Sequence, residues 1–390
     1  MADTRTAQLR RLWLNVHLWI GVGLALLLIP ISISGGLLVW HDEIDALLTP
    51  QRYAVTGAQV ALPPSAYLAK AAEAVAADPE KLQATALRYP ETPGGPMRVL
   101  ARAQQSESGG RPRFVTVFLD PPTAAVLDVM EFRNSLIGFL HVFHENLTIP
   151  QYSGRQIVGW AGVGMLILSL TGIWLWWPRN GSLLRALRWT RSSRFTFNLH
   201  HMLGFWIALP LAAVSLTGIY LSFPQTARSV MSSVATMSPQ GQRGGFAADV
   251  ATQTELTPDR ALQIALAIAP DALPSTLFLP TVQRAGNRGL AWRIQVTRAG
   301  GDDIATIMVD DHSGRASAAP GPQSGDRAAS WIRWIHEGSH SGPVWAFIVF
   351  LTGIFPTIFA VTGVTMWLRK RASRKALDSQ RDAVQLRPAE

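Results

Sequence analysis

Four stretches of the chain carry no charged residue and are each long enough to cross a lipid bilayer. They cover residues 18–40, 157–177, 202–223 and 344–368. A membrane-spanning helix needs about 20 apolar residues, more than most buried helices of soluble proteins have. Only 16% of the residues are charged, against about 25% in a typical soluble protein. The sequence therefore predicts a membrane protein with four transmembrane helices in contact with lipid.

Basic residues beside these stretches predict the direction in which each one crosses. They precede the first stretch, follow the last, and fill the loop between the second and third, which has no acidic residue. Short loops rich in Lys and Arg stay on the cytoplasmic side. We therefore expect both termini on the cytoplasmic side of the membrane and two outward-facing segments. The basic residues are Arg5, Arg10, Arg11, Arg179, Arg185, Arg188, Arg191, Arg194, Arg369, Lys370, Arg371, Arg374 and Lys375.

The two longer segments each show one helical stretch followed by alternating, β-branched runs typical of strands. The expected helices are 65–76 and 258–269, and the expected strands are 82–89, 97–103, 114–119, 275–279, 291–296 and 304–309. The predicted order is transmembrane helix 12–40, outward-facing α+β domain 41–156, transmembrane helix 157–177, cytoplasmic basic loop 178–197, transmembrane helix 198–223, outward-facing α+β domain 224–343, transmembrane helix 344–368 and cytoplasmic tail 369–390.

Motifs recur between the two halves of the chain at nearly constant offsets. The matches are His17 with His200 and Ser34-Gly35 with Thr217-Gly218, 183 residues apart, and His144 with His336 and Thr171-Gly172 with Thr362-Gly363, 192 and 191 apart. The sequence therefore predicts two repeated halves, each made of a span, an outward α+β domain and a second span. Because both halves start inside, we expect their pseudo-axis along the membrane normal.

Eight of the nine histidines lie at or near the end of a span, and the repeat sorts four of them into two pairs. His17 and His200 would face each other at the cytoplasmic side, and His144 and His336 at the outer side. The chain has no cysteine, which excludes thiolate zinc sites and covalently attached haem. Two imidazoles complete the ligation of a b-type haem in an apolar bundle. The pattern predicts two b-type haems, with electron transfer as the resulting chemistry.

Further polar residues near the span ends leave alternatives open. Ordinary capping and interfacial roles suit each of them as well. No catalytic residue is assigned. The alternative haem ligands are His201, His141 and His41, and the candidate contacts to substrate or haem propionates are Arg133, Arg155, Arg333 and His340.

Four short motifs in this order resemble the PepSY-associated transmembrane family. They are H-L-W-x-G from His17, L-H-x-x-x-G from Leu199, I-H-E-G from Ile335, and T-G-[IV]-x-x-W at the ends of spans two and four. Members are often described as iron-regulated membrane proteins. The resemblance covers about residues 10–370. Within the family, the chain most resembles inner-membrane ferric-siderophore reductases with two b haems. This resemblance implies a bacterial inner-membrane protein whose two outward-facing domains are periplasmic PepSY-like domains, with haem ligation by His17, His200, His144 and His336.

The hypothesis is therefore a ferric-siderophore reductase that releases Fe(II) in the periplasm for iron uptake. Its electrons would come from quinol or a cytoplasmic flavoprotein, and no nucleic-acid partner is expected. The spans hold no lysine or carboxylate, which argues against a proton pump or ion carrier. Two alternatives stay open: a non-enzymatic assembly or transport component acting through its PepSY-like domains, and a haem reductase with another periplasmic acceptor.

Overall fold

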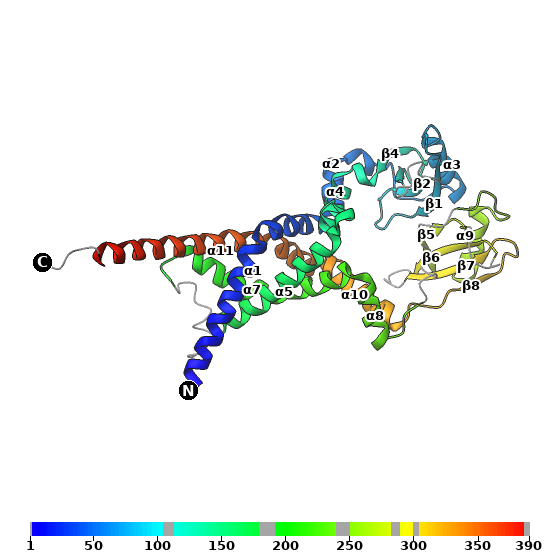
Figure 1. The fold of residues 1–390 in the computed structure, drawn as a ribbon. Coiled ribbons are helices and arrows are strands. Elements are labelled where there is room, and N and C mark those ends of the chain that lie inside the picture. The colour runs from blue at the N-terminus through cyan, green and yellow to red at the C-terminus, as the bar shows by residue number, and fades with distance from the viewer. Residues whose placement is uncertain are drawn as a thin grey trace. The chain divides into compact units, whose positions relative to one another are not determined.

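Four long apolar helices form one unit of the protein, and a β-sheet with its covering helices forms the other (Figure 1). The computed structural model describes residues 2–103, 113–178, 192–238, 250–281, 289–298 and 304–385. The helical unit takes in Met1–His41, Phe139–Thr236 and Gly325–Glu390, and the sheet unit takes in Asp42–Gly138 and Met237–Ser324. Arg179, Arg185, Arg188 and Arg191 of the predicted basic loop lie outside the described residues.

All four predicted spans are continuous helices. They are α1 (Ala2–Leu38), α5 (Gly154–Trp176), α7 (Phe195–Ser222) and α11 (Gly342–Gln385). The parts apolar and long enough to cross a membrane are Arg5–Leu38, Gly154–Trp176, Phe195–Ser222 and Gly342–Arg381. Pro30, Pro210 and Pro356 lie inside these helices, as membrane helices tolerate.

The four long helices pack in a ring. Helix α1 contacts α5 and α11, and α7 contacts the same two helices. Helices α1 and α7 therefore lie diagonally across the bundle, as do α5 and α11. Helices α1 and α11 approach each other through small residues, since Gly36 lies against Gly353.

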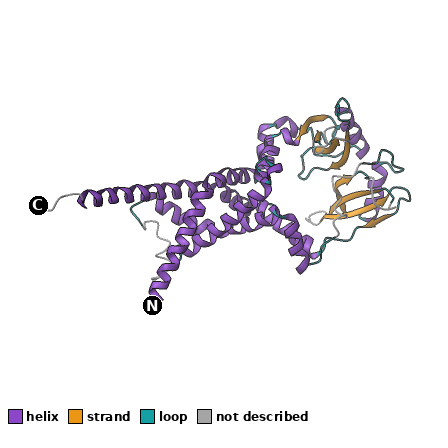
Figure 2. Cartoon of the chain, in the orientation of Figure 1, coloured by secondary structure: helices purple, strands orange, loops and turns teal. Residues whose placement is uncertain are grey.

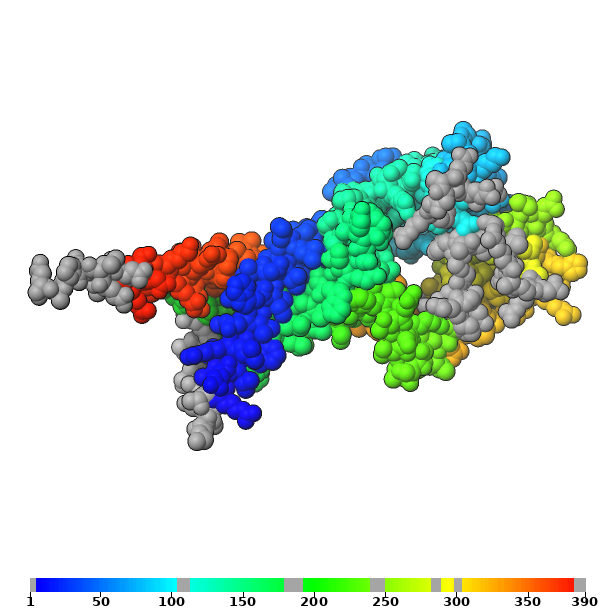
Figure 3. Space-filling model, in the orientation of Figure 1, coloured from blue at the N-terminus to red at the C-terminus, as the bar shows by residue number. Residues whose placement is uncertain are grey.

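Shorter helices adjoin the ends of the long ones. Helix α4 (Leu136–Asn146) precedes η3 (Pro150–Tyr152) and α5, and α10 (Ser324–Glu337) precedes α11. Helix α8 (Pro224–Val234) follows α7. The C-terminal part of α11 continues the helix into the predicted tail, where its basic side chains are exposed, and projects away from the other long helices (Figure 3).

The sheet unit contains eight antiparallel strands in the spatial order β4-β3-β2-β1-β5-β6-β7-β8 (Figure 2). The sequence predicted two separate α+β domains, but the strands of both segments join in one sheet, because Ala86, Leu87 and Arg88 of β1 pair with Phe278, Leu277 and Thr276 of β5. The strands are β1 (Leu82–Arg88), β2 (Met97–Ala103), β3 (Phe114–Leu119), β4 (Val126–Glu131), β5 (Ala272–Phe278), β6 (Ala291–Arg298), β7 (Ile304–Asp310) and β8 (Ala316–Ala318).

Helices α3 (Pro64–Ala74) and α9 (Pro258–Ile268) pack on one face of this sheet. Tyr67 and Ala265 bring the two helices into a single hydrophobic core with strand residues such as Leu87 and Ile294. Asp259 of α9 accepts hydrogen bonds from the backbone N–H and the hydroxyl of Ser65, which ties α9 to the start of α3. The remaining short helices of the unit are α2 (His41–Leu48), η1 (Pro50–Tyr53) and η2 (Phe132–Asn134).

The glycine contact between α1 and α11 generates a prediction for the helical unit. A Cβ atom at Gly353 would lie 2.5 Å from the Gly36 Cα. We expect Gly353→Leu to push the two helices apart, destabilise the fold by about 1–3 kcal/mol and lower the melting temperature of the detergent-purified protein. Gly23→Leu is the matched control because nothing lies within 4 Å of its added Cβ. Equal melting temperatures for the two variants would contradict this packing.

Candidate functional site

Two histidines face each other across the helical unit from diagonal helices. His17 lies on α1 and His200 on α7, with ring centroids 6.3 Å apart and planes at 78°. Each Nδ1 hydrogen-bonds to a threonine of a neighbouring helix, at 2.8 Å for His17 to Thr171 Oγ1 and at 2.9 Å for His200 to Thr362 Oγ1. The two threonines lie on α5 and α11, the other two diagonal helices, so all four long helices contribute to this site. His17 and His200 are called the inner pair after the side predicted for them.

A second pair of histidines, called the outer pair after the side predicted for it, comes from the two short helices that precede α5 and α11. His144 is on α4 and His336 on α10, with ring centroids 6.1 Å apart and planes at 40°. Nδ1 of His144 hydrogen-bonds to the Ile31 carbonyl at 2.9 Å, and Nδ1 of His336 to the Val214 carbonyl at 3.0 Å. The carbonyls belong to α1 and α7. The sequence-predicted partners His17/His200 and His144/His336 are therefore brought together in both cases.

The hydrogen bonds select one tautomer of each imidazole. A carbonyl oxygen only accepts, so Nδ1 of His144 and His336 must carry the proton. The hydroxyls of Thr171 and Thr362 donate to the backbone carbonyls of Ile167 and Ile358, at 2.6 and 2.7 Å, which leaves each oxygen to accept from a histidine. Nε2 then presents its lone pair. No hydrogen bond from the described part of the chain engages Nε2 of these four histidines.

Each imidazole also packs beside the glycine of a Ser-Gly or Thr-Gly dipeptide. A Cβ at Gly35 would lie 2.5 Å from Cε1 of His144, and one at Gly218 would lie 2.8 Å from Cε1 of His336. The corresponding distances at Gly172 and Gly363, beside His17 and His200, are 3.5 and 3.7 Å. The outer pair thus requires glycine, whereas the inner pair has room for a methyl group.

The separation of the rings fits a metal ion bound between them. An imidazole nitrogen lies about 2.0 Å from a transition metal and about 1.1 Å from its own ring centre, so two imidazoles on opposite sides of one ion have centroids about 6.2 Å apart. Metal-binding histidines generally donate their other ring N–H to a protein acceptor, as all four do here. No group of three or more His, Asp or Glu side chains suited to a metal occurs among the described residues. Two imidazoles per ion are the donor set that completes an iron porphyrin, whose ring supplies four nitrogen ligands.

The outer pair is held in the neutral form that metal binding requires. Burial lowers the pKa of His144, and burial together with the nearby His144 lowers the pKa of His336 to about 4. Neutral imidazole is the ligand form of histidine. At neutral pH both rings are therefore ready to bind without losing a proton.

The alternative histidine ligands have other surroundings. His201 stacks between Trp176 and Phe197, with centroids at 5.8 and 5.6 Å. His41 is exposed, with its Nδ1 at 2.9 Å from the Leu38 carbonyl, and His141 lies one helical turn before His144 on α4. The structure thus places none of the three in the facing pairs just described.

The candidate substrate and propionate contacts do not form one cluster. Arg155 is paired with Glu145 at 3.0 Å and donates to the Leu221 carbonyl at 2.8 Å. Arg333 is paired with Glu337 at 3.2 Å within α10. His340 stacks on Trp334, with ring centroids 4.3 Å apart, and Arg133 is an exposed residue of η2 in the sheet unit.

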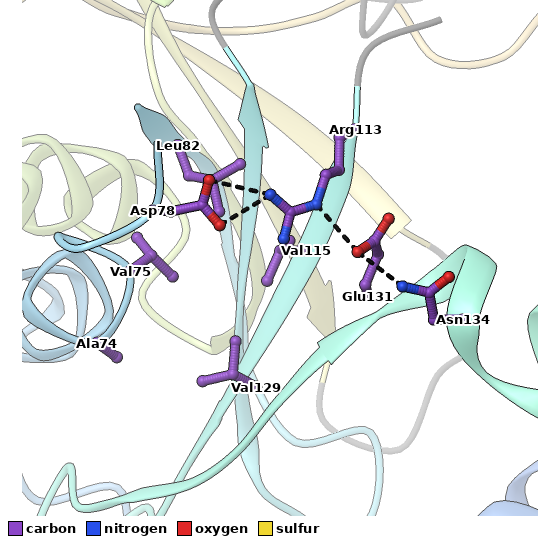
Figure 4. A pocket seen from close by; sticks show the side chains of 9 residues that line it. All are labelled: Ala74, Val75, Asp78, Leu82, Arg113, Val115, Val129, Glu131 and Asn134. Carbon is purple, nitrogen blue, oxygen red and sulfur yellow. Dashed lines mark hydrogen bonds and ion pairs between the residues drawn. The ribbon is translucent and has the colours of Figure 1, made fainter. Parts of the chain in front are cut away.

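A hollow in the sheet unit offers no competing site. Arg113 at its centre donates to both oxygens of Asp78, at 3.0 and 2.8 Å, and to Glu131 at 3.0 Å (Figure 4). These hydrogen bonds raise the pKa of Arg113. Its charge is satisfied within the protein, which is the arrangement of a structural ion-pair network.

Comparison with protein families assigns the chain. The family described as the PepSY-associated TM region matches residues 14–370, which include both histidine pairs. The chain belongs to the PepSY-associated transmembrane family. Membership confirms the resemblance noted from the motifs and suggests an iron-regulated membrane protein. No curated protein matches the chain at a significant level.

The residues that orient the imidazoles were visible in the sequence only as repeated motifs. Ser34-Gly35, Thr217-Gly218, Thr171-Gly172 and Thr362-Gly363 are the four dipeptides that mark the repeat, and each lies against one of the four paired histidines. A hydroxyl residue followed by glycine near the end of each span is the signal. It indicates polar contact and close approach in an apolar helix.

The unequal space beside the glycines predicts different effects of one added methyl group. If His144 and His336 hold an iron porphyrin, Gly35→Ala should displace His144 and lower the amount of porphyrin bound. Gly172→Ala should be tolerated, because its Cβ is in ordinary van der Waals contact with His17. The measurement is the Soret absorbance per mole of purified protein after expression with excess haem supply. Equal absorbance in both variants would show that the glycine contact does not control the site.

Proposed function

We propose that this PepSY-associated transmembrane protein is a two-haem electron conduit that reduces a ferric siderophore on the outer side of a bacterial inner membrane. The observation that carries the proposal is the pair of histidine couples with ring centroids 6.3 and 6.1 Å apart, every Nδ1 being hydrogen-bonded. Bis-histidine haem b supplies one-electron transfer, since it leaves no open position on the iron.

The chain's own residues would orient both haems. Nδ1–H of each histidine donates to a fixed acceptor, which restrains the ring and leaves Nε2 as the nitrogen available to an iron. Thr171 and Thr362 act on the inner pair, and the carbonyls of Ile31 and Val214 act on the outer pair. Holding ligands rigidly in this way limits the structural change that accompanies a change of iron charge.

Basic residues support an orientation with the inner pair toward the cytoplasm. Arg194 directly precedes α7, and the exposed basic run 369–375 continues α11 beyond its apolar part. Lysine and arginine near span ends favour the cytoplasmic side. In this orientation quinol or a cytoplasmic flavoprotein would supply electrons near His17 and His200, and the sheet unit would lie in the periplasm.

The order of elements supports the proposed duplication. Each half of the chain runs from a long helix through one sheet-covering helix and four strands to a short histidine-bearing helix and a second long helix. The halves place His17 and His200 on their first long helices, and His144 and His336 on their short helices. Two equivalent half-sites per cofactor are what such a repeat would supply.

A ferric chelate is the acceptor most consistent with an iron-regulated family. Hard anionic oxygen ligands hold Fe(III) far more tightly than Fe(II), so one electron weakens the complex without breaking a covalent bond. The electron reduces Fe(III) to Fe(II), and the chelator leaves unchanged. No proton relay within the spans is required for this reaction.

Haem stoichiometry tests the cofactor assignment. We expect two haems b per chain in the pyridine haemochrome assay, and about one in His17→Ala, His200→Ala, His144→Ala or His336→Ala, because each variant breaks one pair. His201→Ala and His141→Ala are matched controls that remove the neighbouring imidazole, and they should retain two. A colourless protein would refute the haem assignment and favour the non-enzymatic alternative. Equal haem loss in the controls would refute the assignment of these four histidines as the ligands.

Reoxidation tests the acceptor. Protein reduced with dithionite and freed of excess reductant should be reoxidised under anaerobic conditions by ferric chelates, with Fe(II) trapped by a coloured Fe(II) chelator in equal amount. His336→Ala should slow this reaction strongly, since it breaks the outer pair. Reoxidation by quinone analogues but by none of the ferric chelates would assign a different acceptor.

A further inference from the structure

The face of the sheet opposite α3 and α9 gathers arginine side chains from both segments of the sheet unit. Leu87, Val99 and Ile294 point into the core that the two helices cover. Because side chains alternate along a strand, their neighbours Arg88, Arg98 and Arg293 lie on the other face. The three arginines come from β1, β2 and β6, which lie at or beside the β1–β5 junction.

Two of these arginines oppose each other. Arg88 and Arg98 are direct cross-strand partners in the β1–β2 register. Like charges in that arrangement destabilise a sheet. Arg98 has one acidic partner, Glu91, at 3.9 Å, whereas Arg88 makes no hydrogen bond or ion pair with any residue the structure describes. The fold therefore retains an unfavourable charge pair for which its own side chains offer little compensation.

Arg293 adds a third, partly desolvated charge. Its guanidinium lies over the ring of Phe278, with Cζ 3.8 Å from the ring centroid, and its Nε is buried without a hydrogen-bond partner. Burial lowers the pKa of Arg293. A buried cation with an unsatisfied donor is costly, and an anion beside it would relieve both penalties.

Aromatic rings hold these side chains against the sheet. Arg98 lies over Phe118 with its Cζ 5.7 Å from the ring centroid, much as Arg293 lies over Phe278. Arg52 also lies over Phe118, with its Cζ 4.8 Å from the ring centroid, but its charge is already paired with Asp45 and Asp128. The cation–π contacts order the guanidinium groups of Arg98 and Arg293 without neutralising them.

We propose that Arg88, Arg98 and Arg293 form a binding face for a ferric chelate that carries net negative charge, such as a tris-catecholate or polycarboxylate complex of Fe(III). The inference rests on the proposed ferric-chelate reduction and narrows its substrate to anionic complexes. Planar guanidinium groups match the paired oxygens of catecholates and carboxylates. Two guanidinium groups held over aromatic rings, with Arg88 opposite one of them, suit a multivalent anion whose ligand groups are themselves aromatic or carboxylate.

The test compares two ferric chelates of similar size and different charge on the full-length protein in detergent. The first is a tris-catecholate complex, which is anionic, and the second is a tris-hydroxamate complex, which is uncharged. Binding is measured by equilibrium dialysis with radioactive iron. We expect tighter binding of the anionic complex, with affinity that falls as salt is added.

Arg88→Gln and Arg293→Gln should each weaken binding of the anionic complex about tenfold, as expected for loss of one charge-assisted hydrogen bond. Binding of the uncharged complex should not change. Arg315→Gln is the matched control, since it removes an exposed arginine from the turn before β8 in the same unit. The melting temperature of Arg88→Gln should stay equal or rise, because the variant removes the repulsion with Arg98.

The possible results separate the binding face from the proposed function. Equal binding of both chelates by the unaltered protein, or equal losses for both in the arginine variants, would overturn this inference. Haem content is measured on the same preparations. Two haems with no effect of the arginines would reject the binding face and leave the proposed function in place. Absence of haem would reject the proposed function, while the dialysis would still show whether this face selects anions.

Discussion

The hydrogen bond donated by Nδ1 of each paired histidine is the interaction on which the helical unit depends. A polar imidazole inside a bundle of apolar helices must find an acceptor, because no water replaces a missing one. Thr171, Thr362 and the carbonyls of Ile31 and Val214 supply these acceptors from neighbouring helices. Each bond therefore joins two helices, sets a tautomer and leaves the lone pair on Nε2. The same hydrogen bonds therefore hold the helices together and fix the histidine rings.

The glycine beside each hydroxyl residue explains how these contacts fit. Lipid-facing helices gain little from burying apolar surface, so close approach through small residues stabilises them. At Gly35 and Gly218 the imidazole occupies the space that a Cβ would fill, and at Gly36 and Gly353 the neighbouring backbone does. The outer pair is thus held more tightly than the inner pair, whose glycines leave room. This difference gives the two sites unequal tolerance to substitution within the same motif.

Local patterns in the sequence predicted much of this structure, and long-range pairing was the part they missed. The four spans, both sheet-covering helices and strands β1, β2, β3, β5, β6 and β7 follow from charge-free length and alternation. The facing histidines follow from a constant offset. Strands β4 and β8 were missed because Val126–Glu131 includes charged residues and Ala316–Ala318 is too short to show a period. The β1–β5 pairing joins residues nearly two hundred positions apart, for which local periodicity carries no information.

The β1–β5 pairing also removes two exposed sheet edges and determines which charged side chains share one face of the sheet. If the two segments formed separate sheets, the first would expose an unpaired edge at β1 and the second at β5. Natural proteins avoid such exposed edges. Joining the edges buries one continuous core under α3 and α9, and it also places Arg88 and Arg98 of the first segment on the same sheet face as Arg293 of the second. Neither segment alone has all three cations. In each unit, then, groups from both halves of the chain are combined: imidazoles face each other in the helical unit, and arginines share one face of the sheet in the sheet unit. A ligand recognised by such groups binds only when the two halves have folded together.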